Sequence, residues 1–128
     1  MAMEAGEIGV WEWYLKPTPE SGVLIWDNRM HKLFGTKPET WTGKYSGFAE
    51  CLTPETLMIT EAKIRAAIEH GIPYDYVFQL RLENGASWIH GKGKLYYGKR
   101  GEPERFVGVC LRTVFGNQVT HLLKQYEI

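Results

Sequence analysis

The chain has 128 residues, which suits one domain with a core of its own and is too short for two. Its 15 lysine and arginine residues balance 15 aspartate and glutamate residues, so no net charge would attract nucleic acid or a membrane surface. Since no apolar run approaches the roughly 18 residues of a membrane span, and the start lacks the pattern of a signal peptide, we expect a soluble, cytoplasmic domain without membrane contact.

The first part of the chain predicts two strands and a short helix. Residues 8–15 are rich in aromatic and β-branched side chains. Residues 23–26 form a second apolar run after two prolines and a glycine, so we expect a hairpin with a long turn. Asp27 or Asn28 can cap a short helix, and Gly35 is a typical stop for it.

A longer helix is predicted in the middle of the chain. Residues 37–41 favour one helical turn, whereas residues 42–51 contain two glycines and predict an irregular or briefly helical segment. Thr53 is a candidate N-cap and Pro54 suits the first helical position, and we expect the helix to end at Gly71. The apolar side of this helix consists of Leu57, Ile64, Ala67 and Ile68.

Residues 74–114 predict three consecutive antiparallel strands. Large apolar residues alternate in residues 74–82, an Asn84-Gly85 turn follows, and residues 87–97 form the second strand. Residues 105–111 are too apolar for an exposed edge and predict a central strand. Alternation places two sets of residues on the inward faces of the first two strands: Tyr74, Tyr76, Phe78, Leu80 and Leu82, and Ile89, Gly91, Gly93 and Leu95. Glycines that face inward from mid-strand let another backbone or a ligand come close.

Several of these spacings together resemble the PAS domain family, of the PAS-fold-3 type. The residues that carry the resemblance are Pro73-Tyr74, Phe78, Leu80-Arg81-Leu82, Asn84-Gly85, Trp88-Ile89, Gly93, Gly101-Glu102-Pro103 and Val107-Gly108-Val109, with the stretches IGVWEWYL and VLIWDNRMHKLFG nearer the start. Strands and helices that do not alternate already favour an α+β domain. The resemblance implies a five-stranded antiparallel sheet in the order 2-1-5-4-3 with helices over one face. We expect a PAS domain in residues 1–116 and the start of a C-terminal linker helix in residues 117–128.

The end of the last predicted strand departs from the family pattern. PAS domains usually carry an Asp-Ile-Thr signature there, which joins the strand to the outgoing helix and helps to pass a signal onward. In this chain Arg112, Thr113 and Val114 occupy these positions. We expect the three residues to form the signal relay, and the sequence leaves open whether the usual coupling contact is made.

No pattern in the sequence predicts catalysis or a metal site. The four histidines have no partner at ligand spacing; they are His31, His70, His90 and His121. Cys51 and Cys110 lie in apolar stretches without a CxxC motif, and we expect inert core thiols rather than a disulfide or a metal site. A small cavity-bearing α+β enzyme is an alternative of another class, but it needs a polar dyad on the inward faces, and the sequence offers none.

The resemblance implies a core cavity, which in PAS domains can hold haem, flavin or small metabolites. Haem-binding members place an axial histidine in the long helix, but residues 56–69 contain none and only His70 is near; Cys51 does not lie in the flavin-adduct motif. We expect neither haem nor flavin, and either a small organic ligand or a cavity filled by side chains. The candidate pocket residues are Trp26, Leu33, Ile64, Tyr76, Phe78, Ile89, Gly91 and Cys110.

The resemblance implies a non-catalytic sensory or relay domain of a larger signalling protein, such as a sensor histidine kinase or a diguanylate cyclase. Its partners would be the output domain of the same polypeptide and a second copy in a homodimer. The alternative is a ligand-free dimerisation or docking module. Trp88, with the lysine-rich strand face and Ile8 or Val10, is a candidate for the outer patch where a second subunit or a flanking helix packs.

Overall fold

The computed structural model describes residues 8–81 and 88–113. The elements in chain order are β1 (Ile8–Tyr14), β2 (Leu24–Trp26), α1 (Asn28–Phe34), the 3-10 turn η2 (Pro38–Thr40), α2 (Tyr45–Ala49), α3 (Pro54–His70), β3 (Tyr74–Gln79), β4 (Trp88–Tyr97) and β5 (Pro103–Arg112). Several predicted features lie outside the described residues. They are the helix in residues 117–128, the boundary at residue 116, Val114, His121, Leu82 and the Asn84-Gly85 turn.

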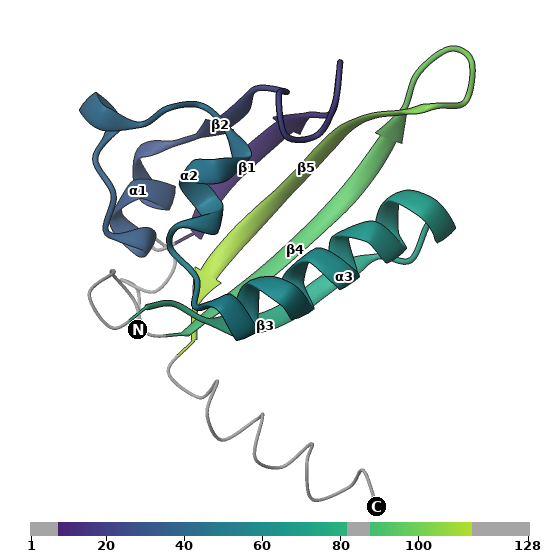
Figure 1. Cartoon of the computed structure of the whole chain (residues 1–128). Helices are drawn as coiled ribbons and strands as arrows, with labels where there is room; N and C mark the ends of the chain where they lie inside the picture. The colour runs from purple at the N-terminus through teal and green to yellow at the C-terminus, as the bar shows by residue number, and fades with distance from the viewer. Residues whose placement is uncertain (1–7, 82–87, 114–128) are drawn as a thin grey trace, which may run out of the picture.

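The strands form one antiparallel sheet in the order β2-β1-β5-β4-β3, which confirms the predicted topology. β5 lies between β1 and β4, as its apolar sequence predicted. Figure 1 shows the helices on one face of the sheet, with α1 and α2 over β1 and β2 and α3 lying lengthwise over β3 and β4. The fold is therefore α+β with two layers, and the core lies between them.

Side-chain caps and glycines set the ends of the helices. Asp27 Oδ1 accepts a hydrogen bond from the backbone N–H of Met30 at 2.9 Å, and Gly35 ends α1 in the left-handed conformation with φ 69°. In α3, Thr53 Oγ1 accepts from the N–H that lies three residues on, and Gly71 ends the helix with φ 68°. These four residues confirm the boundaries that the sequence predicted for both helices.

The strand predicted for residues 74–82 is shorter in the structure. β3 ends at Gln79, and Leu80 forms an isolated bridge with Leu52. The backbone N–H of Arg81 donates to the carbonyl of Cys51 at 3.0 Å. The chain therefore leaves the β4 edge and pairs with the segment before α3, a long-range contact that alternation within the strand does not reveal.

The core beneath the helices is rich in aromatic rings. Trp26 stacks on Trp41, with centroids 4.1 Å apart and planes 19° apart. His31 lies against both indoles with edge contacts at 5.5 and 5.4 Å, and its Nδ1 is 2.8 Å from Thr36 Oγ1. His31 is only 4% exposed, so it is a buried core residue.

This burial makes stability depend on pH through His31. Burial lowers the pKa of His31, and the carboxylates of Asp27 and Glu39 oppose the shift only in part. Because the folded pKa lies below the unfolded value of about 6.5, the neutral imidazole contributes stability above that pH, and this contribution is lost as the pH falls through the folded pKa. We expect the free energy of unfolding to decrease as the pH is lowered from 7 toward 5.

Urea titrations at a series of pH values measure this slope. His31→Gln should flatten it between pH 7 and 5, whereas His70→Gln, at the exposed end of α3, should leave it in place. The lowered pKa values of Glu12 and Asp75 affect the free energy of unfolding only at lower pH, because carboxyl groups titrate below about 4.5. A slope that survives His31→Gln would contradict the assignment to His31.

Candidate ligand cavity

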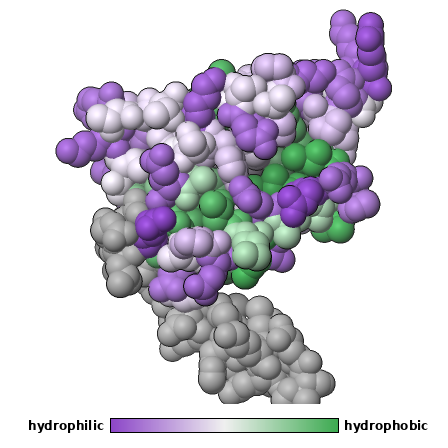
Figure 2. Space-filling view, viewed as in Figure 1, coloured by the Kyte–Doolittle hydropathy of each residue, from purple (hydrophilic) through white to green (hydrophobic). Residues whose placement is uncertain are grey.

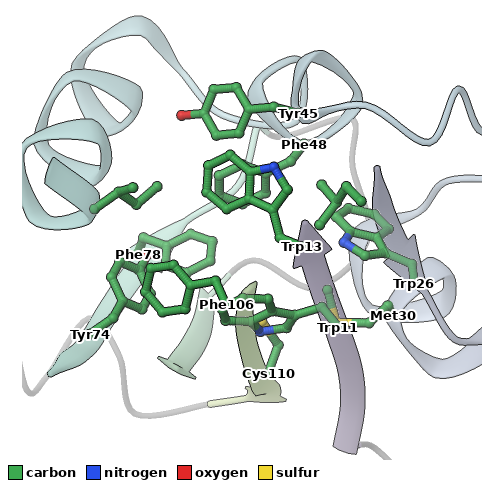
Figure 3. Close-up of a pocket in the computed structure, with 12 residues that line it drawn as sticks. Trp11, Trp13, Trp26, Met30, Tyr45, Phe48, Tyr74, Phe78, Phe106 and Cys110 are labelled. Atoms are coloured by element: carbon green, nitrogen blue, oxygen red, sulfur yellow. The ribbon is translucent and has the colours of Figure 1, made fainter. Parts of the chain in front are cut away.

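A cavity lies between the sheet and the helices, and Figure 3 shows the side chains around it. Measured by where the centre of a water molecule can go, its volume is about 50 Å³. A cavity of that size holds several water molecules or one small organic molecule. Its lining residues are Trp11, Trp13, Leu24, Trp26, Met30, Tyr45, Phe48, Ile64, Tyr74, Phe78, Phe106 and Cys110.

The sheet supplies eight of the twelve lining residues, two each from β1, β2, β3 and β5. Alternation along β1 turns Trp11 and Trp13 toward the helices, and Trp13 lies directly opposite Phe106 in the register of β1 and β5. The ring of Phe106 is 5.3 Å from that of Trp11 and stacks on Trp13 at 6.4 Å, with planes 11° apart. Cys110 lies further along the inward face of β5 and is 4% exposed.

Two glycines make room for the Trp11 indole on the sheet. A Cβ at Gly93 would lie 2.6 Å from both Trp11 Cη2 and Phe106 Cε1. A Cβ at Gly108 would lie 2.3 Å from Trp11 Cζ2 and 2.0 Å from the carbonyl oxygen of Lys92. The close approach that the sequence predicted at inward glycines is therefore real at Gly93, and here the approaching groups are the protein's own aromatic rings.

The helices close the other side of the cavity. Tyr45 and Phe48 from α2 and Ile64 from α3 line it. Tyr45 stacks on Trp13 at 5.1 Å with planes 12° apart, and its hydroxyl donates to Glu61 Oε2 at 3.1 Å. This hydrogen bond ties α2 to α3. Figure 2 shows hydrophobic residues gathered beside α3 on this face of the molecule.

The polar side chains that line the cavity are uncharged at neutral pH. Burial raises the pKa of Cys110 to about 12, although the Trp11 indole opposes the shift in part, and burial also raises the pKa values of Tyr45 and Tyr74. Cys51 is buried as well, its pKa is raised to about 11, and its thiol donates to the carbonyl of Gly47 at 3.4 Å. Both cysteines are free, and their protonated thiols lack the nucleophilic character of a thiolate.

Four of the eight candidate pocket residues line the cavity: Trp26, Ile64, Phe78 and Cys110. The other four lie close by in or around the core. Leu33 and Ile89 are 2% and 0% exposed and pack within the core, and Gly91 lies beneath Phe78. Tyr76 is half-buried at the edge of the core, with the Lys63 ammonium 5.0 Å from the centre of its ring. Binding of a ligand by any of these residues stays a prediction.

The sequence reasoning missed eight lining residues as pocket candidates: Trp11, Trp13, Leu24, Met30, Tyr45, Phe48, Tyr74 and Phe106. Some of them had a usable signal. Trp11 and Trp13 alternate along β1, and Phe106 and Cys110 share one face of β5, so pairing the two strands would have brought them together. Tyr45 and Phe48 gave no clear signal, because their segment is short and contains glycines.

The predicted relay residues lie at the end of β5. Arg112 is the last residue of the strand and is paired with Ile89 of β4. The N–H of Thr113 donates to the carbonyl of Trp88 at 3.1 Å, so Thr113 is still attached to the sheet. In residues 8–81 and 88–113, no group of three or more His, Cys, Asp or Glu side chains could hold a metal ion. Within the same ranges, no helix is long and apolar enough to cross a membrane.

A five-stranded antiparallel sheet in this order, with helices that enclose a cavity on one face, defines a PAS domain. The sequence pattern of the PAS fold family matches residues 23–110. The chain therefore belongs to the PAS family. It is a sensory domain, and the PAS fold is not a catalytic fold.

The similar proteins are signalling proteins. The chain is 31% identical over 128 residues to the probable diguanylate cyclase DgcE of Escherichia coli, covering 98% of this chain but only 11% of DgcE. A sensory box histidine kinase/response regulator from Burkholderia thailandensis superposes with a TM-score of 0.71 at 22% identity, covering 96% of this chain and 89% of that one.

The N-terminal domain of a diguanylate cyclase with a PAS/PAC sensor from Marinobacter aquaeolei superposes with a TM-score of 0.68 at 14% identity, covering 82% of this chain and 94% of that one. At such low identities, both solved structures establish the fold only. The match to DgcE adds similarity in sequence, over a small part of a much longer protein.

Proposed function

We propose that this domain is the sensory module of a larger signalling protein, a diguanylate cyclase or a sensor histidine kinase, and that its core cavity binds a small organic ligand without haem or flavin. The observation that carries the proposal is the apolar cavity between the sheet and the helices, lined by twelve residues. An apolar pocket with few polar groups is the usual form of a small-molecule site. The match to a probable diguanylate cyclase supports the nature of the parent protein.

β5 is the proposed route from the cavity to the rest of the parent protein. Phe106 and Cys110 line the cavity, and the same strand ends at Arg112. A ligand that favours one packing of these side chains over another would shift the position of the strand end, and with it Thr113 and Val114. Such a relay needs two states for which the ligand has different affinities.

A cavity-filling substitution in the full-length parent tests the proposal. Ile64 lines the cavity from α3, so Ile64→Phe places extra volume where the ligand would lie. We expect the output activity of the parent to change at least severalfold and to lose its response to the ligand. Ile59→Phe adds the same volume to the same helix at a side chain that is 48% exposed, and should leave output unchanged. Equal output from wild type and both variants would contradict a sensory role for the cavity.

The alternative is a ligand-free module that pairs with a second copy through the outer face of the sheet. Val10 and Ile25 are each 47% exposed there, and Val10 lies opposite Val109 on β5. An ion pair within the chain borders this apolar patch, with Arg105 Nη1 2.7 Å from Glu12 Oε2. Sedimentation of the purified protein distinguishes the two proposed functions. A dimer that dissociates on Val10→Arg, in a protein that carries no bound compound, favours the alternative.

A further inference from the structure

The cavity as it stands admits only a very small molecule. Its volume of about 50 Å³, measured by where the centre of a water molecule can go, is about a third of the roughly 150 Å³ of an engineered cavity that binds benzene. A ligand of more than a few atoms therefore fits only if one part of the wall moves. The parts of the wall differ in how firmly they are held.

The sheet and α3 are the firmly held parts of the wall. On the sheet side the strands form a continuous ladder, in which Trp13 lies opposite Phe106. Moving a strand would break the hydrogen bonds of this ladder. α3 is 17 residues long and buries Thr60 and Ala67, so moving it would withdraw these side chains from the core. Both displacements would cost much of the stability of the domain.

α2 is held less firmly. It has five residues, Tyr45–Ala49, and each of them is at least partly exposed. The chain is fixed before it, where the carbonyl of Gly43 accepts from the N–H of Leu24 at 2.7 Å. It is fixed again after it, where the carbonyl of Cys51 accepts from the N–H of Arg81 at 3.0 Å. Because a single short helix between two fixed points contains few hydrogen bonds, it can open locally while the rest of the domain stays folded.

Apolar contacts hold part of α2 over the core. The Phe48 ring packs against Phe34 and Phe78, with centroids 6.0 and 6.1 Å away. Contacts of this kind are not directional, so the rings can pack again around a ligand. The wall that α2 contributes is therefore adaptable.

A directional contact joins α2 to α3. Tyr45 stacks on Trp13 at 5.1 Å, as Figure 3 shows, and its hydroxyl donates to Glu61 Oε2 at 3.1 Å. Glu61 lies on α3, three residues before Ile64, which lines the cavity. This hydrogen bond can form only while α2 lies close to α3, so it favours the closed position of α2.

We propose that α2 is a lid on the cavity, that the hydrogen bond from Tyr45 to Glu61 is its latch, and that ligands enter between α2 and α3. When the hydrogen bond breaks, α2 moves away from α3 and uncovers Trp13, which opens the cavity and enlarges it. This inference rests on the proposed ligand-binding function and adds the way in which the site admits a ligand.

Hydrogen–deuterium exchange of the purified chain, read by mass spectrometry of its peptides, measures the opening without a ligand. Tyr45→Phe keeps the ring on Trp13 and removes the hydroxyl. We expect the amides of residues 45–52 to exchange about two- to twentyfold faster, as the loss of one hydrogen bond implies, while those of β5 are unchanged. Glu61→Ala should do the same. The double variant should exceed neither single variant, because both break the same bond.

Chemical labelling of Cys110 shows whether this opening leads into the cavity. Cys110 lines the cavity, is 4% exposed and is a free thiol. Methyl methanethiosulfonate is a small neutral thiol reagent that must enter the cavity to react with it. At one pH, Tyr45→Phe and Glu61→Ala should both label faster than wild type, by a factor similar to that for exchange in α2. Peptide mass spectrometry separates the label on Cys110 from that on Cys51.

Tyr14→Phe is the matched control, because the Tyr14 hydroxyl also donates to a glutamate, Glu12 at 3.0 Å, but at an exposed place on β1. It should change neither rate. The lid is contradicted if the latch variants accelerate nothing, if they accelerate β5 as much as α2, or if α2 exchanges faster while labelling of Cys110 does not. The proposed function fails by a different result, namely unchanged output of the parent protein on Ile64→Phe.

Discussion

Phe106→Ala is expected to lower the free energy of unfolding by about 3–5 kcal/mol, the usual cost of removing a fully buried aromatic ring. Phe106 is 1% exposed and lies on β5, the strand that joins the two halves of the sheet. Its ring contacts Trp11, Trp13 and Tyr74 at centroid distances of 5.3, 6.4 and 6.1 Å. Because these side chains already border a cavity, they cannot move far enough to fill the space that the lost ring leaves.

Chemical denaturation followed by circular dichroism measures this loss. Tyr97→Ala removes a ring of similar size from the end of β4, where the side chain is 53% exposed, and should change stability by less than about 1 kcal/mol. The loss at Phe106 should exceed the loss at Tyr97 severalfold. Similar losses for the two variants would contradict the placement of Phe106 at the centre of the core.

Gly108→Ala is expected to cost at least about 3 kcal/mol, or to prevent folding, although it adds a single methyl group. The new Cβ would lie 2.0 Å from the carbonyl oxygen of Lys92 and 2.3 Å from Trp11 Cζ2. The carbonyl belongs to β4, which pairs with β5 on this side, so it cannot retreat without disturbing the ladder. Trp11 in turn is confined by Phe106.

Gly101→Ala provides a matched control for this substitution. Gly101 has φ 81° and nothing within 4 Å of the position of a Cβ, so alanine there meets backbone strain of about 1–2 kcal/mol but no clash. The midpoint temperature of thermal unfolding should therefore be clearly lower for Gly108→Ala than for Gly101→Ala. A Gly108→Ala protein as stable as Gly101→Ala would show that the sheet does not hold Trp11 against β5 in the way described.

The fold was largely predictable because the local signals agree with one another. Alternation in residues 74–82 and 87–97 predicted the strands, which the structure has at Tyr74–Gln79 and Trp88–Tyr97, and the caps at Asp27 and Thr53 marked the helices. The strand order itself came from the resemblance to PAS domains, since periodicity says which face of a strand is buried but not which strand lies next to it. Leu80 shows the limit, because its bridge to Leu52 depends on a contact remote in sequence.

Only some of the residues that line the cavity could be predicted, because the pairing of strands brings the others into it. Phe78 was identified from alternation within its own strand, whereas Trp13 enters the cavity because β1 pairs with β5. Arg112 and Thr113 were placed at the strand end by sequence alone, and their role in signal relay remains a prediction.

The most direct test of a ligand-binding sensory domain is mass spectrometry of the compounds released when the freshly purified native protein is denatured. Wild type is compared with Ile64→Phe, in which the cavity is filled. We expect a near-stoichiometric small organic compound from wild type that is absent from the variant. No compound from wild type, or the same compound in equal amount from the variant, would contradict it.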